Sequence, residues 1–508
     1  MLHGLHFLLP LLFLIPGPGA SSSDDEIVKE FRRYFRKYKD TPTRVEAVAA
    51  LEEAQSPAVV DVLLPVLGDK EVEVVEAAIQ VLARFKNDAQ INHLLLKLES
   101  DKDARRRIGM LRAVEKAGYP GARDIVLPFL EDRSWDVRRR AIQSLQKHTG
   151  ADIEAAIAPL CDDGEVAVRC AALDALAHFK SELVLTPART DLVHASWQVK
   201  ASAIAALARV RHIDSIEPLL ERLAQEDGRL RQDCGAALAE ITGRNFGERV
   251  DAWNHFWNTY KGRFKIPTDA ELAILREKQR ERQEAYTPPG AVSYHGVSTP
   301  SRSIIFVIDV SGSMEQEITE KELFAEGNYP TFRRIDIIKT ELLRTIEGLE
   351  SYVTFNVLAF ASEVKPWKKG LVRANPLNRS SAMTWIKRLE AIGGDSKQEL
   401  ARAGLVGAAN LEAGKTNSFG ALMAALGVDE KKGIQKGYEV KVDTLFFLSD
   451  GYPSHGKFIE TDDVLREVRK ANQLRGVVIH TIALGEFEKD FMRRLAQENG
   501  GVFVDLGS

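Results

Sequence analysis

The chain has 508 residues, which is enough for two or three domains. Its formal net charge is -4 and 28% of its residues are charged, so the composition excludes the strong overall charge typical of proteins that bind nucleic acid or anionic membranes. Three cysteines occur, Cys161, Cys170 and Cys234, and none belongs to a Cys-Xaa-Xaa-Cys pair. This odd count does not indicate a disulfide framework.

Residues 1–22 have the pattern of a secretory signal peptide. An apolar stretch at 5–15 is too short to span a bilayer, and small residues suited to cleavage follow it. The segment before it has no lysine or arginine, which leaves a buried or disordered N-terminus as the alternative. We therefore expect an exported protein, periplasmic, cell-surface or secreted, without stable membrane insertion. Export without disulfides favours a bacterial periplasm or cell surface.

Residues 42–243 carry an internal repeat, which predicts a helical solenoid that spans 25–262 with its N- and C-terminal capping helices. The segment 25–39 is an amphipathic helix candidate that we expect to cap the array, although a membrane-surface helix has the same pattern. Helix, acidic turn and helix then recur at intervals of 31 to 33 residues. The positions that fix this period are Val72, Ala104, Trp135, Val166, Trp197 and Leu230.

This repeat resembles HEAT-like repeats, which stack into one continuous core. We expect the acidic residue of each turn to cap the second helix, and the basic residue after it to pair with the next repeat. An aromatic cluster at 246–260 predicts a lid on the last repeat, with stacking on a sugar or nucleic acid as the alternative. Residues 263–302 read as a charged helix and a linker.

Residues 303–508 alternate strands with helices, the pattern of a doubly wound α/β sheet. The strand candidates are 304–309, 352–361, 444–449, 477–483 and 502–506. The helical patterns occupy 334–349, 380–391, 418–426, 462–474 and 488–499. The segments 324–329 and 393–414 look like insertions beside the loops that follow the strands.

The first of these strands ends in a group of hard oxygen donors. Residues 304–308 form an apolar run typical of a strand buried on both faces, and Asp309, Ser311 and Ser313 follow it. Gly312 allows a tight turn, so the carboxylate and both hydroxyls can point at one spot. Such donors suit Mg²⁺, Mn²⁺ or Ca²⁺ at the carboxyl end of the sheet.

Two later stretches extend this pattern: a polar loop that contains Thr416, and the apolar strand 444–449, which is followed by Asp450. Together the three pieces resemble the metal-ion-dependent adhesion site of von Willebrand factor A domains. The resemblance implies that Ser311, Ser313 and Thr416 supply hydroxyl ligands. It also implies that Asp309 and Asp450 hold the ion through water or from the second shell.

The predicted function is divalent-cation-dependent protein binding. A Glu or Asp carboxylate of a protein partner would complete the coordination of Mg²⁺, or of Mn²⁺ or Ca²⁺, and the solenoid would offer a second interaction surface. One alternative is a metal-dependent enzyme or hydrolase accessory subunit, but no general base or nucleophile constellation is visible. Another is a scaffold in which the ion only staples loops. The sequence names neither the partner nor the oligomeric state.

Overall fold

A computed structural model describes residues 22–119, 121–280, 292–294, 297–319, 321–393, 414–428, 440–450, 452–473, 475–484 and 489–506. The predicted signal peptide lies outside these residues apart from Ser22. The chain divides into two compact units between Ile157 and Ala158.

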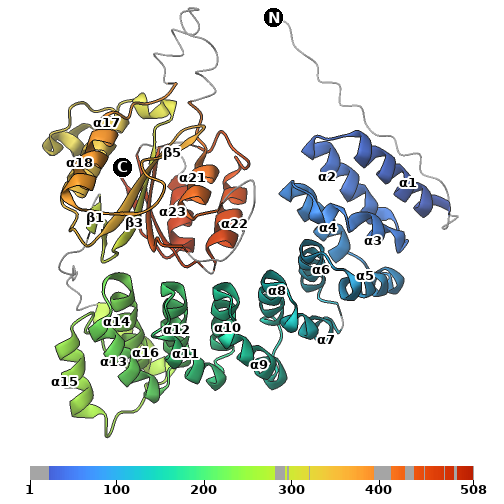
Figure 1. The fold of residues 1–508 in the computed structure, drawn as a ribbon, viewed down its shortest axis with the longest axis horizontal. Helices are drawn as coiled ribbons and strands as arrows, with labels where there is room; N and C mark the ends of the chain where they lie inside the picture. The colour runs from blue at the N-terminus through green and yellow to red at the C-terminus, as the bar shows by residue number, and fades with distance from the viewer. Residues whose placement is uncertain are drawn as a thin grey trace, which may run out of the picture. The chain divides into compact units, whose positions relative to one another are not determined.

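The first unit is a series of short helices that begin at the predicted N-terminal cap (Figure 1). Its α-helices are α1 (Ser22–Lys37), α2 (Thr41–Ala49), α3 (Ala58–Leu63), α4 (Val72–Ala83), α5 (Asp88–Ser100), α6 (Ala104–Ala117), α7 (Ala122–Val126), α8 (Trp135–Leu145) and α9 (Ala151–Ile157). Helix α1 packs against α2 and α3, and its Val28 and Phe31 are buried. Its apolar face therefore covers the start of the array, as the capping role predicts.

Ion pairs connect successive repeats at the acidic turns. Arg44 pairs with Asp69, and the Arg107 Nη2 atom lies 2.9 Å from Asp132 Oδ1. Asp132 Oδ1 also accepts the backbone N–H of Ser134, the N-cap residue of α8. The predicted pairing is thus confirmed in these repeats. The predicted capping by the turn aspartate is wrong at this turn, because Asp132 closes the turn two residues before the cap.

The second unit begins with the remaining helices of the solenoid. They are α10 (Val166–His178), α11 (Leu185–Asp191), α12 (Trp197–Val210), α13 (Ile216–Gln225), α14 (Gly228–Thr242), α15 (Val250–Tyr260) and α16 (Asp269–Arg280). Trp253 and Trp257 of α15 are buried, and the Trp257 indole donates to Glu217 of α13 over 2.9 Å. These rings are thus packed inside the second unit, whereas Tyr260 remains exposed.

The rest of the second unit is the predicted α/β sheet. Its elements are β1 (Val292–Tyr294), β2 (Val297–Thr299), β3 (Ser303–Asp309), α17 (Arg334–Glu347), β4 (Thr354–Phe360), β5 (Val364–Pro366), β6 (Val372–Arg373), α18 (Pro376–Lys387), α21 (Ser418–Ala425), β7 (Thr444–Ser449), α22 (Thr461–Asn472), β8 (Val478–Ala483), α23 (Lys489–Glu498) and β9 (Phe503–Asp505). The strand order is β5-β4-β3-β7-β8-β9, and β6 also pairs with β4. Strands β3, β4, β7, β8 and β9 are parallel, which confirms the doubly wound fold.

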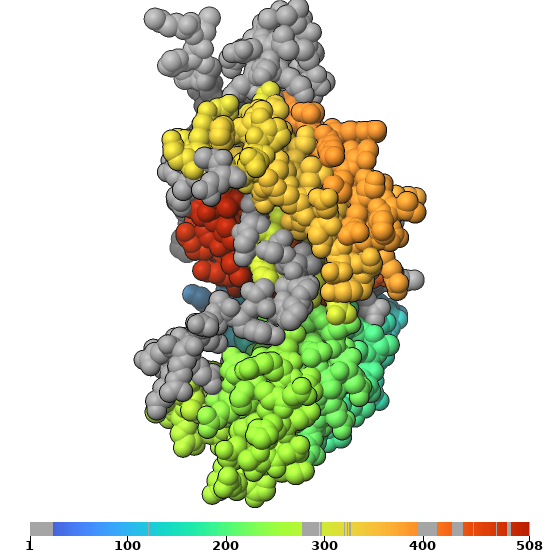
Figure 2. Space-filling model, turned by 90° about the vertical axis from the view of Figure 1, so that its left-hand side faces the viewer, coloured from blue at the N-terminus to red at the C-terminus, as the bar shows by residue number. Residues whose placement is uncertain are grey.

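Helices cover both faces of this sheet. In Figure 1, α17 and α18 lie on one side of the strands and α21, α22 and α23 on the other. Figure 2 views the α17–α18 side, where the yellow-to-orange segment that contains these helices forms the surface. Central strands enclosed in this way need apolar side chains on both faces, and every residue of β7 is buried.

The segment expected to be a linker contributes to the core of the sheet. Strands β1 and β2 form an antiparallel hairpin, and the Tyr294 ring meets Phe306 edge to face with ring centres 5.4 Å apart. Phe306 in turn stacks on Phe446, with ring centres 5.5 Å apart. Three aromatic rings from the hairpin, β3 and β7 therefore form the middle of the core, and Tyr294 is buried.

His480 of β8 makes the stability of the sheet depend on pH. Its ring stacks on Phe446 and its Nδ1 atom accepts the backbone N–H of Val502. Burial lowers the pKa of His480 from 6.5 to about 4. Between these two values the unfolded chain binds a proton that the folded sheet excludes. Stability therefore falls as the pH falls through this window, by at most about 1.4 kcal/mol per pH unit.

The variant His480→Gln is expected to remove this contribution. Thermal melts of the full chain between pH 4 and 7 should then show a weaker loss of stability on the acidic side than the parent protein shows. His255→Gln is the matched control, because His255 is exposed on α15. An equal acid sensitivity of His480→Gln and the parent would contradict the assignment.

Candidate metal centre

The register of two neighbouring parallel strands brings the predicted carboxylates together. Ile308 of β3 lies opposite Leu448 of β7, so Asp309 and Ser449 end the two strands side by side. The Ser449 hydroxyl donates to Asp309 Oδ2 over 2.6 Å. Asp450 is the next residue of the chain, so both carboxylates lie at the carboxyl edge of the sheet, where ligands bind in open α/β folds.

The turn after β3 adds the two predicted serines. The backbone N–H of Ser311 donates to Asp309 Oδ1 over 2.7 Å. The hydroxyl oxygens of Ser311 and Ser313 are 3.2 Å apart, and the Ser313 hydroxyl donates to Asp450 Oδ1 over 2.8 Å. Asp309, Ser311, Ser313 and Asp450 thus form one hydrogen-bonded cluster, and Asp309, Ser311 and Asp450 are buried.

Thr416 lies on a loop that is tied to both of these turns through its backbone. Gly414 O accepts the N–H of Gly312, and Thr416 O accepts the N–H groups of Ser454 and His455 in the segment after Asp450. Thr416 is buried. The loop that carries Thr416 is therefore hydrogen-bonded to the turn after β3 through Gly414 and to the segment after β7 through Thr416, whose N–H also donates to the Ser454 hydroxyl over 3.0 Å.

Two residues that are hydrogen-bonded to the cluster were absent from the sequence prediction. Arg334, in the first turn of α17, lies with its Nη1 atom 2.6 Å from Asp450 Oδ2, and both side chains are buried. A signal existed in the sequence: Arg334, Ile338 and Leu342 recur at intervals of four, so a charged residue falls on the apolar stripe of the helix. Ser449, the partner of Asp309, was also missed.

The electrostatics of the cluster follow from burial and from its neighbouring charges. Burial raises the pKa of Asp309 to about 7, and the negative charge of Asp450 adds to the effect. Burial also raises the pKa of Asp450, although Arg334 and the Ser313 hydroxyl oppose this shift. The two carboxylates therefore resist sharing the site as a pair of anions, and a further positive charge would stabilise them.

The chemistry of the donor set fits a hard divalent cation. The cluster offers hydroxyl and carboxylate oxygens and no sulfur or imidazole ligand, which is the preference of Mg²⁺, Mn²⁺ and Ca²⁺. Across the described residues, no group of three or more His, Cys, Asp or Glu side chains is arranged to hold a metal. The five predicted site residues do not form such a group, because three of them, Ser311, Ser313 and Thr416, contribute hydroxyl groups.

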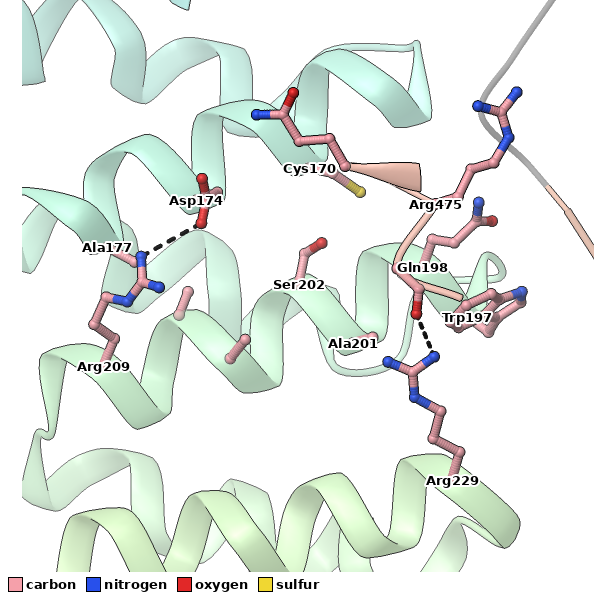
Figure 3. Close-up of a pocket in the computed structure, with 14 residues that line it drawn as sticks. Cys170, Asp174, Ala177, Trp197, Gln198, Ala201, Ser202, Arg209, Arg229 and Arg475 are labelled. Atoms are coloured by element: carbon pink, nitrogen blue, oxygen red, sulfur yellow. Dashed lines mark hydrogen bonds and ion pairs between the residues drawn. The ribbon is translucent and has the colours of Figure 1, made fainter. Parts of the chain in front are cut away.

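A cavity of about 200 Å³ elsewhere in the same unit is lined by α10, α12, α14 and the turn after α22 (Figure 3). Its charged side chains already contact protein acceptors. Arg209 lies 3.4 Å from Asp174, and Arg229 donates to the carbonyl oxygens of Gly476 and Asp443. The charged groups of this cavity are therefore engaged by the protein itself, and the cluster around Asp309 is the stronger candidate site.

The other sequence expectations have mixed outcomes. Of the two proposed insertions, residues 394–413 lie outside the described part of the chain. In the other, Phe324 packs into the core of the sheet, so this segment is partly structural.

The three cysteines are buried with free thiols, and burial raises their pKa values to about 12. No helix in the described ranges has both the length and the apolar run that a bilayer crossing needs.

Comparison with known families identifies both halves of the chain. A HEAT-repeat model matches residues 30–115, 91–162, 124–190 and 153–239. A model of the von Willebrand factor type A domain matches residues 333–505, which begins past the motif of Asp309 to Ser313. The chain therefore contains HEAT repeats followed by a von Willebrand factor type A domain, as both resemblances imply.

Individual relatives are distant. Inter-alpha-trypsin inhibitor heavy chain H1 of Mesocricetus auratus is 26% identical over 205 residues, which cover 40% of this chain and 18% of that protein. The von Willebrand factor A domain-containing protein 3A of Homo sapiens is 27% identical over 203 residues, 39% of this chain and 13% of that protein. An aerotolerance-related membrane protein from Bacteroides fragilis aligns with a TM-score of 0.26 and 12% identity, over 40% of this chain and 90% of that one. The chain thus spans less than a fifth of the length of the two curated relatives.

Proposed function

We propose that this chain, with HEAT repeats followed by a von Willebrand factor type A domain, is a divalent-cation-dependent protein-binding protein. The observation that carries the proposal is the hydrogen-bonded cluster of Asp309, Ser311, Ser313 and Asp450 at the carboxyl edge of the sheet. Ser311, Ser313 and Thr416 would hold Mg²⁺, Mn²⁺ or Ca²⁺. The solenoid would provide a second interaction surface for protein partners.

The hydrogen bonds of the two carboxylates support a binding role. Asp309 accepts from Ser311 and Ser449, and Asp450 accepts from Ser313 and Arg334, so protein donors already engage both oxygens of each carboxylate. The carboxylates then orient the hydroxyls and contribute only part of their charge to the ion. A bound cation would supply an incompletely neutralised positive charge to which an Asp or Glu side chain of a protein partner could bind.

The same geometry gives no specific support to the alternative of a metal-dependent enzyme. A hydrolytic role needs a general base with access to the substrate, whereas Asp309 and Asp450 are buried and hydrogen-bonded. The names of the two curated relatives also state no catalytic activity. We therefore propose binding without catalysis.

The test is selection of peptides that bind the full chain in Mg²⁺, followed by release with EDTA. We expect the recovered peptides to share an Asp or Glu whose replacement by Asn or Gln abolishes binding. Equal binding in Mg²⁺ and in EDTA would contradict the proposal. A rise of the melting temperature with Mg²⁺ but no ion-dependent peptide would instead favour an ion that only staples the loops.

A further inference from the structure

Arg334 is a charged residue on the buried, otherwise apolar stripe of α17. The residue before it, Arg333, pairs with Asp336, and the Arg333 side chain is 36% exposed. Arg334 instead turns inward to Asp450, and its side chain is 7% exposed while that of Asp450 is fully buried. A guanidinium is permanently charged, so the protein places one fixed positive charge inside the cluster.

This positive charge acts on the same carboxylate that would attract a cation. Asp450 Oδ2 contacts Arg334, and Asp450 Oδ1 contacts the hydroxyl of Ser313, which is itself a predicted ligand. Only one carboxylate separates the guanidinium from the proposed ion, and like charges at such short range repel in a buried site. With Arg334 present, the three ionisable groups of the cluster carry a net charge of about -1 when both aspartates are ionised, and without it about -2.

We infer that Arg334 is a positioning residue that sets the cation affinity of the site. It competes with the divalent ion for the charge of Asp450, and it fixes this carboxylate so that the Ser313 hydroxyl stays directed into the cluster. The inference rests on the proposed function, because it concerns the same ion. Its consequence is weaker, more readily reversible cation binding than the oxygen ligands alone would give.

The experiment compares the full chain with Arg334→Gln and Arg334→Lys by titration calorimetry with MgCl₂ and MnCl₂ after EDTA treatment. We expect Arg334→Gln to bind the cation at least tenfold more tightly than the parent. Arg334→Lys keeps the charge and should remain within about threefold of the parent. The control Arg333→Gln, which removes the neighbouring guanidinium, should not change the affinity.

Thermal melts give a second measurement that does not depend on a partner. In EDTA, Arg334→Gln should melt below the parent, because Asp450 loses its buried counter-charge. The rise of the melting temperature from EDTA to saturating Mg²⁺ should be larger for Arg334→Gln than for the parent. A purely structural role predicts a lower melting temperature for both Arg334→Gln and Arg334→Lys, with no tighter binding in either.

A charge-balanced pair keeps the test decisive if Arg334→Gln does not fold. Asp450→Asn alone should bind the cation much more weakly than the parent. The double variant Asp450→Asn/Arg334→Gln carries no unpaired guanidinium, so its cation affinity should be at least tenfold higher than that of Asp450→Asn. If the two variants of this pair bind the cation equally well, or if the parent and Arg334→Gln do, the role assigned to Arg334 is wrong while the proposed function stands. Binding by Arg334→Gln but not by the parent supports that role and contradicts the proposed function. No binding by any folded variant overturns both.

Discussion

Replacing Asp309 with asparagine is expected to reduce divalent cation binding by roughly 100-fold. Asn keeps the shape of the side chain and can still accept the N–H of Ser311, but it removes the negative charge that a cation needs. The expected effect is large because Asp309 is fully buried at the centre of the cluster, where no solvent screens its charge. Calorimetric titration of the EDTA-treated full chain with MgCl₂ measures it.

Asp443→Asn is the matched control for this variant. Asp443 is half-buried and lies at the opposite end of β7, where its carboxylate accepts a hydrogen bond from the Ser301 hydroxyl. Loss of a carboxylate at that end of the strand should leave cation affinity unchanged. If both variants bind Mg²⁺ like the parent, the ion does not sit at the carboxyl edge of the sheet.

Phe446→Ala is expected to destabilise the sheet by about 3–5 kcal/mol. The ring is fully buried in the central strand β7, stacks on Phe306 and meets Tyr294 edge to face with ring centres 5.6 Å apart. Its removal leaves a cavity between β3, β7 and the hairpin that rigid neighbouring strands cannot fill. Hydrogen exchange of the full chain, followed on peptides from β3 and β7, measures the loss separately from the solenoid.

Leu377→Ala provides the comparison. Leu377 lies on α18 of the same sheet domain and is 82% exposed, so its replacement should change stability by no more than about 0.5 kcal/mol. Equal protection of β3 and β7 in the parent and in Phe446→Ala would contradict the position assigned to this ring. The two variants together separate the core from the surface of one domain.

Much of the fold could be predicted because its signals are local and repeated. The recurrence of turns from Val72 to Leu230 predicts the solenoid, since every repeat solves the same packing problem. The apolar runs predict all five parallel strands to within two residues at each end. The antiparallel strands β5 and β6 were missed, because two or three residues carry no measurable alternation.

The predictions failed where residues distant in the sequence decide the structure. The hairpin of β1 and β2 looked like a linker, since only the folded core shows that Tyr294 fills the space beside Phe306 and Phe446. The strand ends correctly brought Asp309 near Asp450. Arg334 was missed because its partner Asp450 lies 116 residues away in the sequence, and the local pattern does not predict a contact between them.

Diffraction from a crystal of the full chain soaked in MnCl₂ tests the central claim most directly, because Mn²⁺ gives an anomalous signal that locates it without assumptions. The account predicts a single strong peak within bonding distance of the hydroxyl oxygens of Ser311, Ser313 and Thr416, with Asp309 and Asp450 behind them. A peak elsewhere, or a Thr416 hydroxyl directed away from Ser311 and Ser313 in the Mn²⁺-bound crystal, would contradict it.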